Sequence, residues 1–135
     1  MNQWSREYSR VFSEQNRAQF PANREWLIEQ AGKVMPLVDE SLRLTNEAAA
    51  KYEEASQLMS KEQERKALNL IASSLRMEGE IKQLFKTQAQ LASDHTLNDA
   101  KSFNEKFNSL TELIHQKQKE KDQQFDEGKR LLLGK

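Results

Sequence analysis

Proline and glycine are almost absent from the middle of this 135-residue chain. Residues 37–127 contain no proline and one glycine, Gly79, and are rich in Ala, Leu, Glu, Gln, Lys and Arg. These residue types lose little side-chain freedom in a helix. A sheet protein needs turn residues about every eight to twelve positions, and this stretch lacks them. The sequence therefore predicts a set of long helices.

The first expected helix is short and amphipathic. It covers about residues 2–19, and its apolar side chains recur at helical spacing on one face: Trp4, Tyr8, Val11 and Phe12. Pro21 marks its end, because proline disfavours the helical conformation of the residue before it. We expect this helix to cover one side of the remaining structure.

Three long helices are expected after Pro21, over about residues 24–58, 61–93 and 97–130. Each carries apolar residues at alternating helical spacings, as in helices that pack on neighbours or form coiled coils. Similar lengths joined by short connections suit an up-and-down antiparallel arrangement. The sequence predicts one all-α domain, residues 1–135, in which a short N-terminal helix joins a bundle of three long helices.

Two interpretations exist for the joint at Met59 and Ser60. The run from Ser60 to Gln63 matches a capping box, in which serine and glutamine side chains satisfy backbone amides at a helix start. The apolar residues of the first long helix nevertheless keep the same helical spacing past Met59, which fits a single continuous helix, one unbroken rod. The capping box favours a hairpin. Thr96–Asp99 is a second candidate box, and Pro36 is expected to kink helix 24–58 without ending it.

The apolar stripes also predict which side chains form the core. Helix 61–93 has the broadest apolar face, so we expect it to contact two neighbours. The residues expected to be buried are Leu42, Tyr52, Leu68, Leu75, Leu84, Phe103, Phe107 and Leu110.

Composition argues against several classes of function. Basic and acidic residues number 21 each, so no net charge attracts nucleic acid. Arg10, Arg17 and Arg24 recur near aromatic residues, but they are expected on the outer side of a packed segment. The absence of cysteine excludes disulfides, thiolate zinc sites and cysteine nucleophiles. No apolar run reaches the roughly 20 residues needed to span a bilayer.

One pattern resembles a metal-binding motif. Glu112 and His115 form an E-x-x-H on a helix, which di-iron bundles use twice. The other histidine, His95, has Ala92 where the second glutamate would stand. We therefore expect no metal, no cofactor and no enzyme activity, and the sequence identifies no small-molecule ligand.

Surplus apolar residues near both ends indicate binding. Three consecutive leucines cannot all face one core stripe, so at least one is expected to lie exposed or in an interface. We expect a non-enzymatic interaction module (an adaptor, chaperone or assembly component) with a protein partner or a weak homodimer. The candidate partner contacts are Trp4, Tyr8, Phe125, Leu131, Leu132 and Leu133.

The alternative is a ligand-sensing or extracytoplasmic bundle, excised from a longer chain that is membrane-anchored or exported. Arg6, Glu7 and Arg10 interrupt what would be the apolar core of a signal peptide. The expected location is the cytoplasm if the chain is complete, and outside it if a leader was removed.

Overall fold

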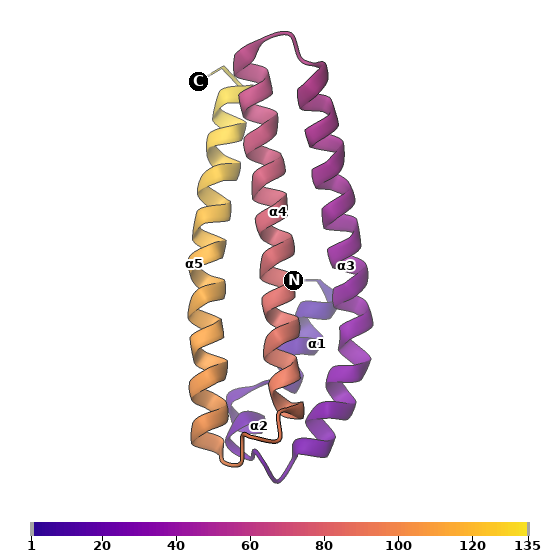
Figure 1. The fold of residues 1–135 in the computed structure, drawn as a ribbon, viewed down its shortest axis with the longest axis vertical. Coiled ribbons are helices and arrows are strands. Elements are labelled where there is room, and N and C mark those ends of the chain that lie inside the picture. Colours follow the sequence, from indigo (N-terminus) through magenta and orange to yellow (C-terminus); the bar gives the residue numbers. More distant parts are fainter. Residues whose placement is uncertain (1, 135) are drawn as a thin grey trace. The chain divides into compact units, whose positions relative to one another are not determined.

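Residues 2–134 are described by the computed structural model drawn in Figure 1. No strand occurs in this part of the chain. The predicted all-α fold, an up-and-down antiparallel bundle of three long helices with a short N-terminal segment, is confirmed. The helices are α1 (Gln3–Val11), α2 (Glu14–Ala18), α3 (Arg24–Leu58), α4 (Glu62–Gln90), a 3₁₀ helix (Leu91–Ser93) and α5 (Ala100–Leu132).

The predicted short N-terminal helix is present, but it ends at Val11, and residues 14–18 form a second short helix within the predicted range of 2–19. Asn2 begins α1, since its Oδ1 accepts a hydrogen bond from the Ser5 amide at 3.0 Å. Ser13 interrupts the segment: its ψ is 157°, and its Oγ accepts a hydrogen bond from the Asn16 amide at 3.2 Å. Serine is a strong helix N-cap. A second helix therefore starts at Ser13 instead of the first one continuing.

Helices α3 and α4 form a hairpin, which excludes the single rod. Arg76 Nη2 lies 2.6 Å from Glu53 Oε1, and Lys82 Nζ donates to Thr45 Oγ1 at 2.6 Å. Residues further along α4 thus contact residues earlier in α3, as antiparallel helices require. Helix α3 runs without interruption through Pro36, and its bounds match the prediction.

The start of α4 differs from the predicted capping box. The helix begins at Glu62, and the Lys61 carbonyl accepts a hydrogen bond from the Arg65 amide at 3.1 Å. The capping box predicts that the Gln63 side chain reaches back to Ser60. Its Nε2 instead donates to the Leu131 carbonyl at 2.9 Å, which joins the start of α4 to the end of α5.

The start of α5 also lies further along the chain than expected. Asp99 Oδ1 accepts a hydrogen bond from the Ser102 amide at 2.7 Å, so Asp99 caps the helix. Thr96, the predicted cap, belongs to the preceding turn, where its amide and hydroxyl both donate to Asp94 Oδ1.

Two compact units divide the chain, and each is described by itself. Unit 1 contains residues 2–41 and 83–113, and so includes α1, α2 and part of each long helix. Within this unit, the first two helices lie on one side of the segments of the long ones (Figure 1). An aromatic cluster dominates its core: Trp4, Tyr8, Phe12, Phe20, Phe103 and Phe107 are buried, with Phe85 packed against them.

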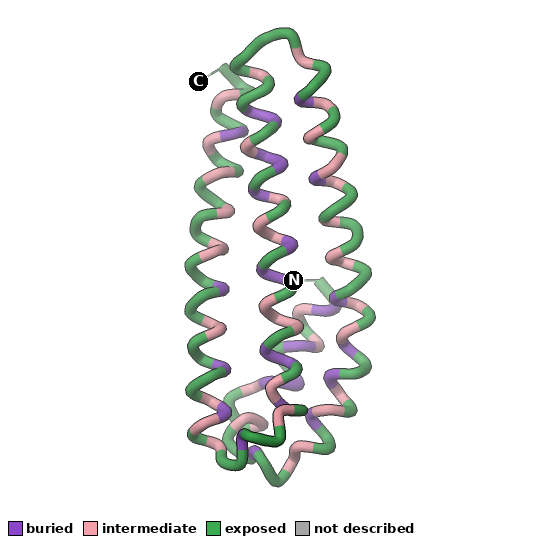
Figure 2. Tube along the Cα trace, viewed as in Figure 1, coloured by how far each residue is buried: buried purple, intermediate pink, exposed green. Residues whose placement is uncertain are grey.

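Unit 2 contains residues 42–82 and 114–134, so it is built from α3, α4 and α5 alone. Helix α4 contacts both others: Arg76 pairs with Glu53 of α3, and Ser73 Oγ lies 3.0 Å from Gln124 Oε1 of α5. The predicted pair of neighbours for this helix is confirmed. Figure 2 marks the buried positions in purple. Many of those in unit 2 are small or polar: Ala49, Ser56, Ala67, Ala72, Ser74, Gly79 and Gly128.

The predicted core is correct in part. Leu68, Phe103 and Phe107 are buried. Tyr52 is exposed, so that prediction is wrong. Its stripe of α3 has no fourth helical segment over it in unit 2. The remaining members of the predicted set are half-buried: Leu42, Leu75, Leu84 and Leu110.

Candidate functional site

In unit 1, α1 covers the inner stripes of the long helices with aromatic contacts. The ring centroids of Trp4 and Phe85 are 5.3 Å apart, and those of Tyr8 and Phe85 are 5.0 Å apart. Phe12 stacks on Phe107 of α5 at 5.9 Å. These contacts make the short helix an integral part of the unit 1 core.

A buried glutamine fixes the position of α1. The Tyr8 hydroxyl donates to Gln88 Oε1 at 2.7 Å, and Gln88 Nε2 donates to the Phe107 carbonyl at 2.9 Å and to Thr111 Oγ1 at 2.7 Å. Burial raises the pKa of the Tyr8 hydroxyl far above its usual value, so it remains a donor. Trp4 and Tyr8, two predicted partner contacts, are buried within the chain and leave a partner little surface.

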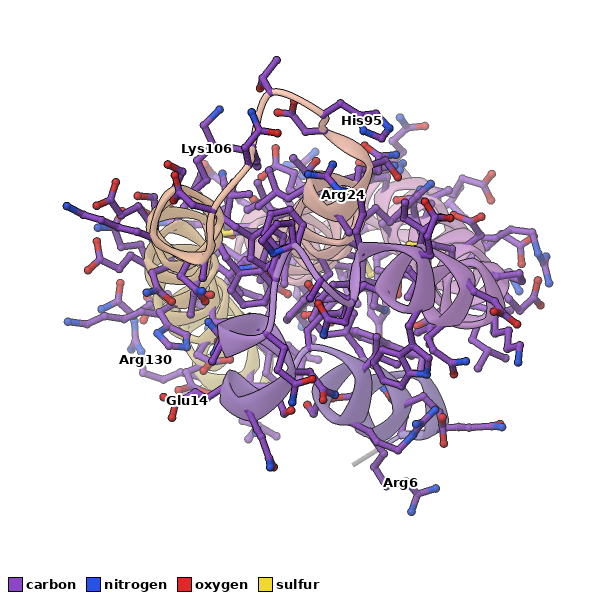
Figure 3. All side chains as sticks on the ribbon, turned by 90° about the horizontal axis from the view of Figure 1, so that it is seen from below. Arg6, Glu14, Arg24, His95, Lys106 and Arg130 are labelled. Atoms are coloured by element: carbon purple, nitrogen blue, oxygen red, sulfur yellow. The ribbon has the colours of Figure 1, made fainter. Side chains whose placement is uncertain are left out.

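Two arginines secure the rest of the N-terminal segment. Arg17 Nη1 donates to Asn104 Oδ1 at 3.1 Å, and its guanidinium lies 4.4 Å from the Phe107 ring centroid. Arg24 donates to the carbonyls of Asp94 and Leu97 in the connection between α4 and α5. Figure 3 shows Arg24 directed at this connection. Both guanidinium groups therefore bind groups of unit 1: Arg17 connects the N-terminal segment to α5, and Arg24 binds the connection between α4 and α5.

In unit 2, one aromatic residue on each of the same stripes of α3 and α5 is exposed. Tyr52 follows Val34 by eighteen residues, and Phe125 follows Phe107 by eighteen, which is about five turns at about 3.6 residues per turn. Each pair therefore lies on one side of its helix. Val34 and Phe107 are buried with α1, whereas Tyr52 and Phe125 are 38% and 40% exposed.

Tyr52 of α3 and Phe125 of α5 lie at similar levels along α4, on the two helices that flank it. Their chain neighbours Glu53 and Gln124 contact Arg76 and Ser73, which are within one turn of each other. A hollow of about 280 Å³ lies at this level, lined by Ser74, Leu75, Glu78, Lys121, Asp122 and Phe125. We use the name docking face for Tyr52, Leu75 and Phe125 together with the charged groups Glu78, Lys82 and Lys121.

The charged groups of the docking face form one cluster. The Lys82 side chain is 7% exposed, and its Nζ lies 3.7 Å from Glu78 Oε1. Lys121 Nζ lies 2.7 Å from Glu78 Oε2 and 3.8 Å from Asp122 Oδ1. Two ammonium groups therefore share the Glu78 carboxylate. Asp122, with its side chain 71% exposed, lies at the solvent edge.

Burial lowers the pKa of the Lys82 ammonium below its usual 10.5, against the opposing attraction of Glu78. The unfolded chain therefore binds this proton more tightly than the folded protein does. The charged lysine opposes folding at neutral pH. This destabilising contribution decreases as the pH rises from the lowered pKa of Lys82 in the folded protein towards its higher pKa in the unfolded chain.

We expect Lys82→Met to raise the free energy of unfolding by about 1 kcal/mol at pH 7, because methionine fills the same space without a buried charge and Glu78 keeps its ion pair with Lys121. The difference in free energy of unfolding between this variant and the parent protein should decrease as the pH approaches the pKa of Lys82 in the unfolded chain. Urea unfolding at several pH values measures it. Lys119→Met, at an exposed position, is the control with no pH-dependent effect. A loss of stability for Lys82→Met at pH 7 contradicts the prediction.

The C-terminal candidate residues lie near the α3–α4 turn. Leu132 and Leu133 are exposed, and Leu131 is half-buried. Gln63, at the start of α4, binds the Leu131 carbonyl, and Leu58 is exposed at the end of α3. We use the name apolar tip for Leu58, Leu132 and Leu133.

The metal-like pair does not meet other ligands. Glu112 and His115 are both exposed on α5. Among residues 2–134, no three His, Cys, Asp or Glu side chains gather closely enough to hold a metal ion. No helix of the described part is long and apolar enough to cross a bilayer.

Comparison with protein-family models, curated proteins and solved structures gives no match.

Proposed function

We propose that this protein is a non-enzymatic helical-bundle interaction module, an adaptor, chaperone or assembly component, that binds a protein partner at the docking face. One observation carries the proposal. Tyr52 and Phe125 remain about two-fifths exposed on helix stripes that α1 covers in unit 1. Covering apolar area gains about 25 cal/mol per Å², and aromatic anchors commonly dominate protein interfaces.

The test is capture of partners from the native cell, followed by mass spectrometry. We expect the parent protein to retain a protein that the double variant Tyr52→Ala/Phe125→Ala loses. Trp26→Ala is the matched control, because Trp26 is an equally exposed aromatic on α3 outside the docking face, at 38%. Capture that survives the double variant, or fails equally with Trp26→Ala, contradicts the proposal.

The apolar tip supports a second proposal, a weak homodimer through its exposed leucines. Leu132 and Leu133 are adjacent exposed leucines, which favour self-association, and two-fold dimers are the commonest result. We expect Leu132→Glu/Leu133→Glu to shift the protein towards monomer in sedimentation experiments at high concentration. Leu44→Glu changes an exposed leucine elsewhere on α3 and is the control. If the parent protein is itself monomeric at high concentration, the tip is not a dimer interface.

A further inference from the structure

We propose that the docking face binds a single amphipathic helix of a partner protein, and that the apolar stripe of this helix carries a carboxylate. This inference rests on the proposed function, since it names the element that binds there. The helix would lie over α4 between Tyr52 and Phe125. It would give unit 2 the fourth helical segment that α1 provides in unit 1.

The packing of α1 shows what kind of element fits these stripes. Trp4, Tyr8 and Val11 are buried residues of α1, spaced by four and three positions. They share one cluster with Val34 of α3 and Phe107 of α5. The docking face continues the same two stripes about five turns further along each helix. A helix with apolar residues at spacings of four and three is therefore the matching shape.

Charge complementarity indicates the carboxylate. Glu78 is the one carboxylate in the sheltered part of the cluster, and both Lys82 and Lys121 lie within 4 Å of it. Asp122 also approaches Lys121, but it extends into water, where screening weakens the pair. A docked helix would exclude water from the Lys121 ammonium. An acidic side chain on that helix would replace the lost hydration with a charge-assisted hydrogen bond.

A second copy of the chain has no free helix with this stripe in its described residues. The apolar residues of α1 are buried in unit 1, and α2 is five residues long with no buried position. Helix α4 is packed against both α3 and α5. A separate partner protein therefore suits the docking face better than a second copy.

Two labelled synthetic peptides of about 18 residues, or five turns, test the inference. Each carries leucines at spacings of four, three and four. On the same stripe one peptide has glutamate and its twin has glutamine. Fluorescence anisotropy measures binding to the full protein. We expect saturable binding with a Kd about fivefold lower for the glutamate peptide, a modest effect of one charge-assisted contact. Tyr52→Ala/Phe125→Ala should weaken both peptides by about tenfold or more.

The Lys121→Gln variant should abolish the fivefold difference between the peptides, whereas Lys119→Gln, at an exposed position, should keep it. Equal affinities for the twins, a difference that survives Lys121→Gln, or no saturable binding overturns the inference. A dimer of the parent protein that Tyr52→Ala/Phe125→Ala dissociates in sedimentation also overturns it, in favour of a second copy. The proposed function stands if cellular capture still depends on Tyr52 and Phe125. It fails if that dependence is absent.

Discussion

Replacing Phe103 with alanine is expected to lower the free energy of unfolding by about 3–5 kcal/mol. Phe103 is fully buried, and its ring stacks on Phe20 with centroids 4.2 Å apart and planes 14° apart. It also meets Phe107 at 6.1 Å. Truncation removes both ring contacts and leaves a cavity between the N-terminal segment and α5. Urea unfolding followed by circular dichroism measures the change.

Tyr52→Ala is the informative comparison, because Tyr52 also lies on a core-like stripe. It is 38% exposed and belongs to the docking face, so we expect its truncation to cost less than about 1 kcal/mol. If Tyr52→Ala destabilises the protein as much as Phe103→Ala, then Tyr52 is packed. The docking face would then be wrongly assigned.

The sequence predicts the long helices well because their signals are repeated over many turns. Both ends of α3, Arg24–Leu58, agree with the prediction, and Pro36 does not interrupt it. Apolar residues on either side of that proline keep one helical phase. A signal summed over a helix of this length outweighs one unfavourable residue when neighbours cover the apolar stripe.

Helix starts are less predictable because several polar residues compete at each one. In the sequence Ser13 resembles an ordinary polar position within one helix, yet its hydroxyl caps a new one. Between α4 and α5, Thr96 and Asp99 could both cap. Asp99 does so, while Asp94 holds Thr96 in a turn. The choice depends on backbone conformations of the connection, which a periodic pattern does not encode.

The site is predictable only in part, since periodicity identifies an apolar stripe but not what covers it. The sequence predicts Phe125 as a partner contact, and the structure shows its side chain exposed. The sequence predicts that Tyr52 lies in the core, because nothing in its stripe reveals that α1 and α2 belong to unit 1 alone. One signal is available in the sequence: Glu78 and Lys82 follow Leu75 by three and seven residues, so charged residues lie on an apolar stripe.

The second large effect concerns Gly128, where α5 approaches α4. A Cβ at this position would lie 2.9 Å from Ile71 Cγ1 and 3.0 Å from the Ala67 carbonyl oxygen. The first atom belongs to a buried side chain and the second to helix backbone, so neither can easily move. We expect Gly128→Leu to lower the free energy of unfolding by about 2–3 kcal/mol through overpacking.

Gly32→Leu is the matched control, because it makes the same chemical change inside α3 with no atom within 4 Å of the added Cβ. Leucine is a better helix former than glycine by up to about 1 kcal/mol, so this variant should be more stable than the parent protein. Thermal or urea unfolding of both variants measures two effects of opposite sign. If Gly128→Leu is also stabilising, α4 and α5 are not in close contact at Gly128. The change in the free energy of unfolding at both positions would then come from the helix propensity of leucine alone.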